Sequence, residues 1–220
     1  MIDFRFYLIT DRKLHADRCS LISAVRRALK GGVTAVQLRE KDLGTRELLK
    51  LSYRMRTLTD EFGARLFIND RFDIALAVGA DGVHLTQKSI PAGAVRAAAG
   101  RKLLIGVSTH SISEARAAER GGADFITFGP VYRTPSKLGY GPPAGLDALR
   151  RAAGRISIPV FAVGGIKSRR LGDVHETGAH GVALISEVFG ARHIEQKAGE
   201  LLSLIQNTFA GSRPARIMNA

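Results

Sequence analysis

The sequence is poor in cysteine, tryptophan and acidic residues. Cys19 is the one cysteine in 220 residues, so no intrachain disulfide can form, and we expect a reducing, cytoplasmic location. Tryptophan is absent and aromatic residues make up only 6% of the chain, which disfavours a surface that binds nucleic acid by stacking. Lys and Arg number 33 against 20 Asp and Glu, giving a formal net charge of +13.

Long hydrophobic runs are also missing. No run approaches the roughly 18 apolar residues that a membrane-spanning helix needs. The apolar stretch near the N-terminus ends at Asp11 and Arg12 without a small-residue cleavage site, so it predicts a first strand and not a signal peptide. A hydrophobic content of 45% and a mean hydropathy of +0.01 are typical of one globular domain.

The basic residues are spread along the chain and do not form one block. This spacing predicts solvated helix surfaces and a site that attracts phosphates, and we expect neither a nucleic acid nor a membrane as partner. The remote alternative is a non-catalytic basic barrel that binds nucleic acid. The scattered arginines are Arg26, Arg27, Arg46, Arg116, Arg120, Arg150 and Arg151.

Short apolar runs alternate eight times with longer amphipathic segments, among them the helix-length stretches Thr45–Glu61, Ser113–Arg120 and Leu146–Ala153. The runs show little polar alternation, as strands buried on both faces do. They are Phe6–Ile9, Ala35–Leu38, Leu66–Ile68, Gly82–Leu85, Leu103–Val107, Phe125–Phe128, Val160–Val163 and Val182–Ile185.

Strand–helix alternation predicts parallel pairing through right-handed crossovers. Similar Gly-Ala-Asp/His turns at Gly79, Gly122 and Gly178 precede three of the strands, where glycine can end a helix in the left-handed conformation. We therefore expect a single-domain (β/α)8 TIM barrel over residues 1–208, with a disordered basic tail over 209–220. A doubly wound open sheet is the alternative.

Polar residues follow nearly every predicted strand, at the end where such a barrel places its catalytic residues. One such residue alone could be a helix cap or a solvated turn, but their shared position predicts an active site. They include Thr10 and Asp11, Gln37 to Lys41, Asn69 and Asp70, Thr86 to Ser89, Ser108 to His110, Thr134 to Lys137, Gly164 and Gly165, and Ser186.

Gly164 and Gly165 predict a phosphate-binding loop, because backbone N–H groups without Cβ atoms beside them can approach an anion. Ile185 and Ser186 follow the last strand and would complete that site. The alternative is a tight turn forced by the glycines.

The segment Gln37-Leu38-Arg39-Glu40-Lys41 alternates in side-chain direction if it stays extended. Gln37, Arg39 and Lys41 would then share one face, where two cations and an amide suit a diphosphate attached to a heterocycle.

Three further polar positions leave alternatives open. Lys137 lies in a Gly/Pro-rich segment that resembles a lid and could close over a phosphate. Asp70 stands where a helix N-cap is expected. His110 is either a cap-region residue or an acid/base group, whereas His84 and Thr86 could face the lumen.

Together these residues resemble the thiamine phosphate synthase family, which includes the related thiazole tautomerases. The resemblance runs in order as far as about Phe189. The matching stretches are Tyr7–Arg12, Val36–Lys41, Ile68–Leu85, Ile105–His110, Gly122–Lys137, Ile158–Ile166 and Gly178–Ser186.

The resemblance implies a homodimeric barrel enzyme that joins a hydroxymethylpyrimidine diphosphate to a thiazole phosphate, with magnesium assisting. Catalysis would rest on Arg39, Lys41 and Lys137, which stabilise the departing pyrophosphate. By motif, Gln37, Leu38, Arg39, Glu40, Lys41 and Asn69 would hold the pyrimidine diphosphate, Ser108 and Lys137 its pyrophosphate, Asp70 the magnesium ion, and Thr134, Pro135, Ser136, Gly165, Ile185 and Ser186 the thiazole phosphate.

One position departs from the synthase pattern. Ser89 stands where synthases carry a second magnesium-binding Asp, and Lys88 precedes it. This departure and the long segment up to Pro143 resemble the tautomerase branch, in which the histidine matching His110 would be the acid/base group. Synthase therefore stands as the expected function, with tautomerase as the alternative.

Overall fold

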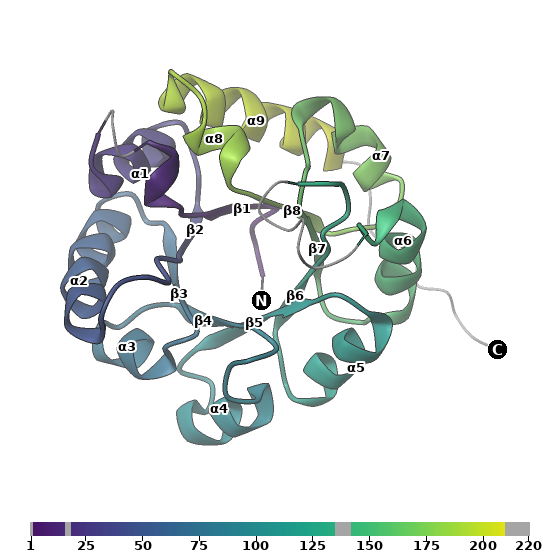
Figure 1. Ribbon diagram of the computed structural model, residues 1–220, viewed down its shortest axis with the longest axis horizontal. Coiled ribbons are helices and arrows are strands. Elements are labelled where there is room, and N and C mark those ends of the chain that lie inside the picture. The colour runs from purple at the N-terminus through teal and green to yellow at the C-terminus, as the bar shows by residue number, and fades with distance from the viewer. Residues whose placement is uncertain (1, 16–18, 135–141, 210–220) are drawn as a thin grey trace.

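The computed structural model describes residues 2–15, 19–134 and 142–209. Eight parallel strands close into a barrel with helices around the outside (Figure 1). Leu8 on the first strand pairs with Val36 on the second and with Leu184 on the eighth, which closes the ring. The (β/α)8 prediction is confirmed, and the open doubly wound alternative is wrong.

The strands lie close to their predicted positions. Three differ by one or two residues at their ends. The ladder continues into polar residues or glycine at Arg65, Asn69, Ser108, Thr109 and Gly181, and it leaves out the apolar residues Leu103 and Ile185. The strands are β1 Phe6–Ile9, β2 Ala35–Leu38, β3 Arg65–Asn69, β4 Gly82–Leu85, β5 Leu104–Thr109, β6 Phe125–Phe128, β7 Val160–Val163 and β8 Gly181–Leu184.

Helices follow the strands, and side-chain caps fix several of their starts. The hydroxyl oxygens of Ser20 and Ser111 accept hydrogen bonds from N–H groups in the first turns of their helices. The helices are α1 Leu21–Lys30, α2 Thr45–Glu61, α3 Phe72–Ala77, α4 Ala92–Ala99, α5 Ile112–Arg120, α6 Gly145–Arg155, α7 Leu171–His175, α8 Ser186–Phe189 and α9 Ile194–Phe209, with 3-10 turns η1 Arg12–Leu14 and η3 Ser168–Arg170.

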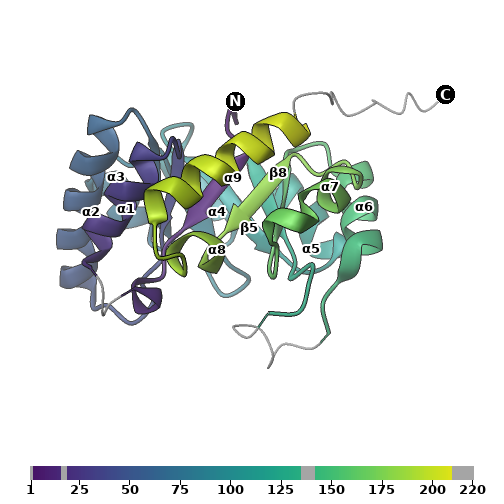
Figure 2. The same cartoon turned by 90° about the horizontal axis from the view of Figure 1, so that it is seen from above.

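Helix α9 lies along the outside of the barrel and packs against α1, α7 and α8 (Figure 2). It ends at Phe209, whose side chain is buried, so the folded unit extends one residue past the predicted limit of 208. The remainder of the predicted tail lies outside the described residues.

Alternate strand residues build two separate cores. Phe6 and Leu8 belong to the outer core between the sheet and the helices. Tyr7 and Ile9 belong to a second cluster inside the barrel, which also contains Ala35, Phe67, Phe125, Phe161 and Ala183.

The lumen is closed at its amino-terminal end. Phe4 precedes β1, and its ring lies 5.3 Å from the ring of Phe161 and 5.5 Å from that of Tyr7, centroid to centroid. The N-terminal segment accordingly lies in the middle of the ring of strands in Figure 1. A ligand can therefore reach the lumen only from the carboxyl-terminal end of the strands.

The turns that lead back into strands have the predicted glycine conformation, with φ of 63° at Gly79, 81° at Gly122 and 82° at Gly178. In two of these turns an aspartate, Asp81 or Asp124, bonds both to a helix arginine and to a strand N–H. Asp124 accepts hydrogen bonds from Arg96 at 2.5 Å and from the N–H of Ile105 at 2.7 Å.

In the part of the chain that the structure describes, no helix has the length and apolar character needed to cross a bilayer.

Candidate active site

Gln37 and Asn69 form an amide pair at the mouth of the barrel. Gln37 follows Ala35 on the lumen face of β2, and its Nε2 donates to Oδ1 of Asn69 at the end of β3, at 3.1 Å. Oε1 of Gln37 is buried and has no hydrogen-bond partner among the described residues. Since buried acceptors are nearly always paired, this oxygen is suited to a donor on a bound heterocycle.

The residues after Gln37 separate as strand alternation predicts. Leu38 is buried in the outer core, whereas Arg39 is half-buried and its backbone N–H donates to Oγ1 of Thr10 at 2.9 Å. Lys41 lies in the turn after β2, and its side chain is exposed. The side chain of Leu38 therefore points away from the mouth, and only its backbone could contact a substrate.

Glu40 is a structural residue in this arrangement. Its buried carboxylate accepts from Oγ1 of Thr10 at 2.7 Å and from the backbone N–H of Arg12 at 3.3 Å, and it also pairs with the Arg12 guanidinium. These bonds connect the loops after β1 and β2. They leave the carboxylate little capacity to bind a substrate.

Asp70 follows β3 in a left-handed conformation, with a φ of 68°. No other non-glycine residue in the described ranges has a positive φ. Its N–H donates to the carbonyl of His84 at 2.8 Å. The N-cap of α3 is Arg71, so the interpretation of Asn69 and Asp70 as the helix cap is wrong. The exposed Asp70 carboxylate is thus available to a ligand.

Ser89 does not reproduce a second carboxylate. Its Oγ accepts from the N–H of Thr86 at 2.8 Å and lies 3.0 Å from Oγ1 of Thr86. No group of three or more His, Cys, Asp or Glu side chains that could hold a metal occurs among the residues described. The rim fits a magnesium ion held by Asp70, substrate oxygens and water, as Mg²⁺ commonly is, but not one held by two protein carboxylates.

Ser108 is supported from inside the barrel by His84. Nε2 of His84 lies 3.0 Å from Oγ of Ser108, and Nδ1 lies 3.4 Å from the hydroxyl of Tyr7. Gly106 makes room for this histidine, because a Cβ there would lie 2.6 Å from Nδ1. The prediction that His84 faces the lumen is confirmed.

Burial, together with the charge of Arg39, lowers the pKa of His84 to about 3. The imidazole is therefore neutral at physiological pH, with one donor and one acceptor nitrogen.

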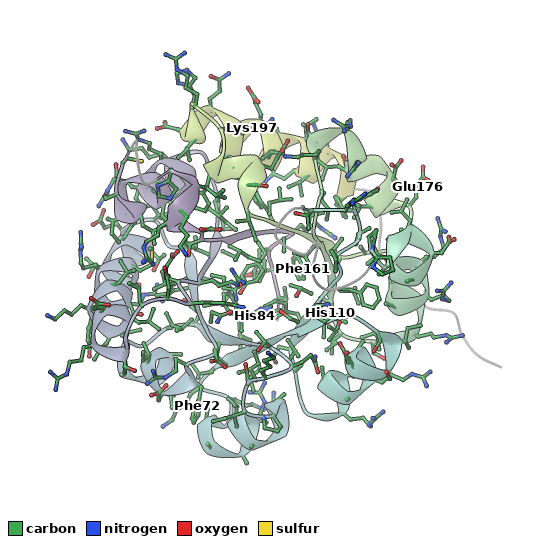
Figure 3. All side chains as sticks on the ribbon, viewed as in Figure 1. Phe72, His84, His110, Phe161, Glu176 and Lys197 are labelled. Carbon is green, nitrogen blue, oxygen red and sulfur yellow. The ribbon has the colours of Figure 1, made fainter. Side chains whose placement is uncertain are left out.

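His110 lies directly after β5, on the rim. Figure 3 places it with His84 and Phe161 toward the centre of the ring, whereas Lys197 and Glu176 lie at the periphery. Its Nδ1 contacts the carbonyl of Gly129, and its backbone N–H donates to Glu114 at 2.7 Å. The backbone contact is that of a cap-region residue, and the side chain is exposed on the rim, so the geometry accommodates both interpretations.

The predicted phosphate loop follows β7. Gly164 and Gly165 have φ values of 94° and 67°, and a Cβ on Gly165 would lie 2.7 Å from the carbonyl oxygen of Arg133. Glycine is therefore required here. The N–H groups of Gly165 and Ile166 donate no hydrogen bond within the described part of the chain, which suits a backbone cradle for an anion.

Residues after the eighth strand complete this side of the mouth. The side chain of Ile185 packs on the lumen cluster, and Ser186 is exposed at the start of α8. Thr134 is half-buried after β6. The predicted ligands Pro135, Ser136 and Lys137, and most of the predicted lid, lie outside the described residues.

Sequence reasoning missed three residues of the site. Tyr7 underlies His84, and it could have been found from the alternation along β1, which puts it on the same face as Ile9. Arg170 contacts the glycine loop from η3, which follows the loop directly, and Tyr132 contacts it from the segment after β6. No sequence pattern indicates the contact of Tyr132.

Comparison with known proteins agrees with this geometry. Residues 6–188 match the family described as thiamine monophosphate synthase. A protein of Geobacter sulfurreducens, provisionally assigned as thiamine-phosphate synthase, is 54% identical over 93% of this chain and 95% of its own. The thiamine-phosphate synthase of Syntrophomonas wolfei is 46% identical over 90% and 95%. The solved structure of thiamine phosphate pyrophosphorylase from Pyrococcus furiosus has a TM-score of 0.84 at 38% identity, covering 93% of this chain and 96% of that one.

Proposed function

The chain belongs to the thiamine monophosphate synthase family, and we propose that it is a transferase that joins a hydroxymethylpyrimidine diphosphate to a thiazole phosphate. The products are thiamine phosphate and pyrophosphate. The alternatives, a thiazole tautomerase and a basic barrel that binds nucleic acid, are not favoured, because the relatives it matches are described as synthases.

The observation that carries this function is the pairing of Gln37 with Asn69 beside Arg39 at the mouth. The amide pair offers a buried acceptor, Oε1 of Gln37, to which no described residue donates, and this suits an amino-substituted pyrimidine ring. Arg39 follows Gln37 by two residues and is half-buried, and its guanidinium suits the diphosphate on the same substrate. Ser108 lies on β5, beside His84 of β4, and would donate its hydroxyl to the pyrophosphate.

The chemistry needs charge stabilisation and positioning, and no protein nucleophile. The C–O bond to pyrophosphate breaks with its electron pair leaving on oxygen, and the lone pair of the thiazole nitrogen then forms the C–N bond. Arg39, Lys41 and Lys137 would stabilise the charge of the leaving group. The glycine loop after β7, with Ser186, would hold the thiazole phosphate so that its nitrogen faces the reacting carbon.

We propose that magnesium assists, held by the Asp70 carboxylate together with substrate oxygens and water. When bound, Mg²⁺ neutralises negative charge on the pyrophosphate. The neutral hydroxyl of Ser89 would contribute little, because it is already bonded to Thr86.

We further propose that the protein works as a homodimer in the cytoplasm. The single cysteine, Cys19, supports a reducing compartment, and the dimer is the state that membership of this family implies. Light scattering of the purified protein would measure the oligomeric state.

Complementation tests the proposed function in a cell. Expression of the chain in a bacterium that lacks its own thiamine phosphate synthase should restore growth without added thiamine. An Arg39→Ala variant expressed at the same level should not restore it. Failure of the wild-type chain, present in soluble form, would contradict the synthase assignment.

A further inference from the structure

Two peptide planes of the glycine loop are fixed by hydrogen bonds from outside the loop. The carbonyl of Gly164 accepts from the N–H of Tyr132 at 3.0 Å. The carbonyl of Gly165 accepts from Nη1 of Arg170 at 2.6 Å. In a planar trans peptide the C=O and N–H point in opposite directions. These two bonds therefore turn the N–H groups of Gly165 and Ile166 away from Tyr132 and Arg170.

Arg170 is itself held in place. It ends the 3-10 turn η3, and its guanidinium carbon lies 4.0 Å from the centroid of the Tyr132 ring. A guanidinium over an aromatic face is attracted by the negative charge of that face. Burial raises the pKa of Tyr132, with Asp173 adding to the effect, so the ring carries a neutral phenol.

We propose that Arg170 is a positioning residue for the thiazole phosphate, acting through the Gly165 carbonyl to aim the loop N–H groups at the anion. Glycine has wide conformational freedom, so without this bond the Gly165–Ile166 peptide could rotate and its N–H could leave the phosphate. The inference rests on the proposed function for the identity of the ligand. It goes beyond that function because Arg170 need not touch the substrate.

This arrangement predicts selectivity for one substrate. Arg170 and the glycine loop follow β7, whereas the pyrimidine residues Gln37 and Asn69 lie on β2 and β3, which do not neighbour β7 in the barrel. Loss of Arg170 should thus weaken binding of the thiazole phosphate and leave that of the pyrimidine diphosphate intact.

Arg170→Gln, Arg170→Lys and Arg169→Gln test the proposal. Arg169 is the adjacent, exposed arginine, so Arg169→Gln removes the same charge without touching the loop. The experiment is calorimetric titration of each protein with thiazole phosphate, together with the KM for each substrate at saturating concentration of the other. Arg170→Gln should raise the Kd and KM for thiazole phosphate about tenfold, the scale of one charged hydrogen bond. Arg170→Lys, which keeps the charge but loses the planar donor, should show a smaller rise.

The KM for the pyrimidine diphosphate should change by less than about twofold in every variant, since additivity holds for separated sites. An unchanged Kd in Arg170→Gln, an equal loss for both substrates, or the same loss in Arg169→Gln would overturn the proposal. If Arg170→Gln does not fold, Arg170→Lys decides in the same way. If the wild type binds thiazole phosphate but forms no thiamine phosphate, the proposed function fails while the Kd comparison still tests Arg170.

Discussion

Polar side chains on the carboxyl-terminal rim differ in whether their atoms are already bonded within the fold. The carboxylate of Glu40 and the hydroxyl of Ser89 are both engaged by neighbouring loop residues. Oε1 of Gln37 is buried without a hydrogen-bond partner in the described ranges, and the carboxylate of Asp70 is exposed and does not cap a helix. The residues with spare bonding capacity are the ones expected to meet a ligand, because an unpaired buried group is costly until something binds it.

Lys137 is predicted to neutralise the departing pyrophosphate. Lys137→Ala should lower kcat roughly 100-fold or more, as the loss of a charge contact made in the transition state does. Steady-state kinetics with both precursors measures it. Lys102→Ala, an exposed lysine before β5 and thus at the opposite end of the barrel, is the matched control. Equal turnover of Lys137→Ala and wild type would remove Lys137 from the mechanism.

His110 separates the synthase from the tautomerase chemistry. Asparagine can still donate to the Gly129 carbonyl that Nδ1 now contacts, but it cannot shuttle a proton. We expect His110→Asn to keep condensation activity within about threefold of wild type, because a dissociative mechanism needs no acid/base group there. A near-complete loss of condensation in a folded variant would argue that His110 takes part in the reaction.

The residue at position 89 is expected to determine how much magnesium the enzyme needs. Hard dications prefer charged oxygen, so Ser89→Asp should lower the magnesium concentration needed for half-maximal rate by about tenfold, or about 1.4 kcal/mol. Ser89→Asn supplies a neutral side chain of the same shape as the control. The condensation rate is measured against Mg²⁺ concentration at saturating precursors. If all three proteins respond alike, position 89 is not at the metal.

At the scale of elements, apolar runs locate the strands because parallel strands in a barrel are buried on both faces. The strand ends are harder to predict. β5 continues through Ser108 and Thr109, which pair with Thr127 and Phe128, although polar side chains there indicated a loop. At the start of β8, Gly181 belongs to the strand because it pairs with Phe161 of β7. Glycine is needed there because a Cβ would lie 2.2 Å from the Arg5 carbonyl oxygen, which a sequence pattern cannot reveal.

In the site, too, features within one strand could be predicted from the sequence, whereas contacts between separate loops could not. Gln37 and Arg39 could be placed on one face from strand alternation alone. The bonds of Tyr132 to Gly164 and of Glu40 to Thr10 depend on which loops the closed barrel brings together. Those contacts could be found only from the fold.

Asp124 should contribute more to the free energy of unfolding than a fully exposed carboxylate does. It serves Arg96 of α4 and the N–H of Ile105 at once, so Asp124→Ala removes the partner of the Ile105 N–H and breaks the ion pair with Arg96, whose bonds to the Gly122 carbonyl remain. We expect the free energy of unfolding to fall by about 2 kcal/mol. Asp147→Ala, which removes an exposed partner of Arg150, should change it by less than about 0.5 kcal/mol. Urea denaturation of the variants measures both values, and equal losses would contradict a special role for Asp124.

At the scale of the whole molecule, the barrel separates stability from function. Aromatic rings around Phe4 fill its amino-terminal end, and the polar residues expected to bind substrate gather at the other end. The charge of +13 is consistent with substrates that are both phosphorylated, since a basic protein attracts anions. Fold, rim residues and family membership thus point to one reaction.

Incubation of the purified chain with hydroxymethylpyrimidine diphosphate and thiazole phosphate, with and without magnesium, tests the central claim most directly. Chromatography of the products should show thiamine phosphate and pyrophosphate in equal amounts when magnesium is present, and much less of both without it. If neither product forms while the thiazole carboxylate phosphate is isomerised by the same preparation, the synthase assignment is wrong and the tautomerase alternative replaces it.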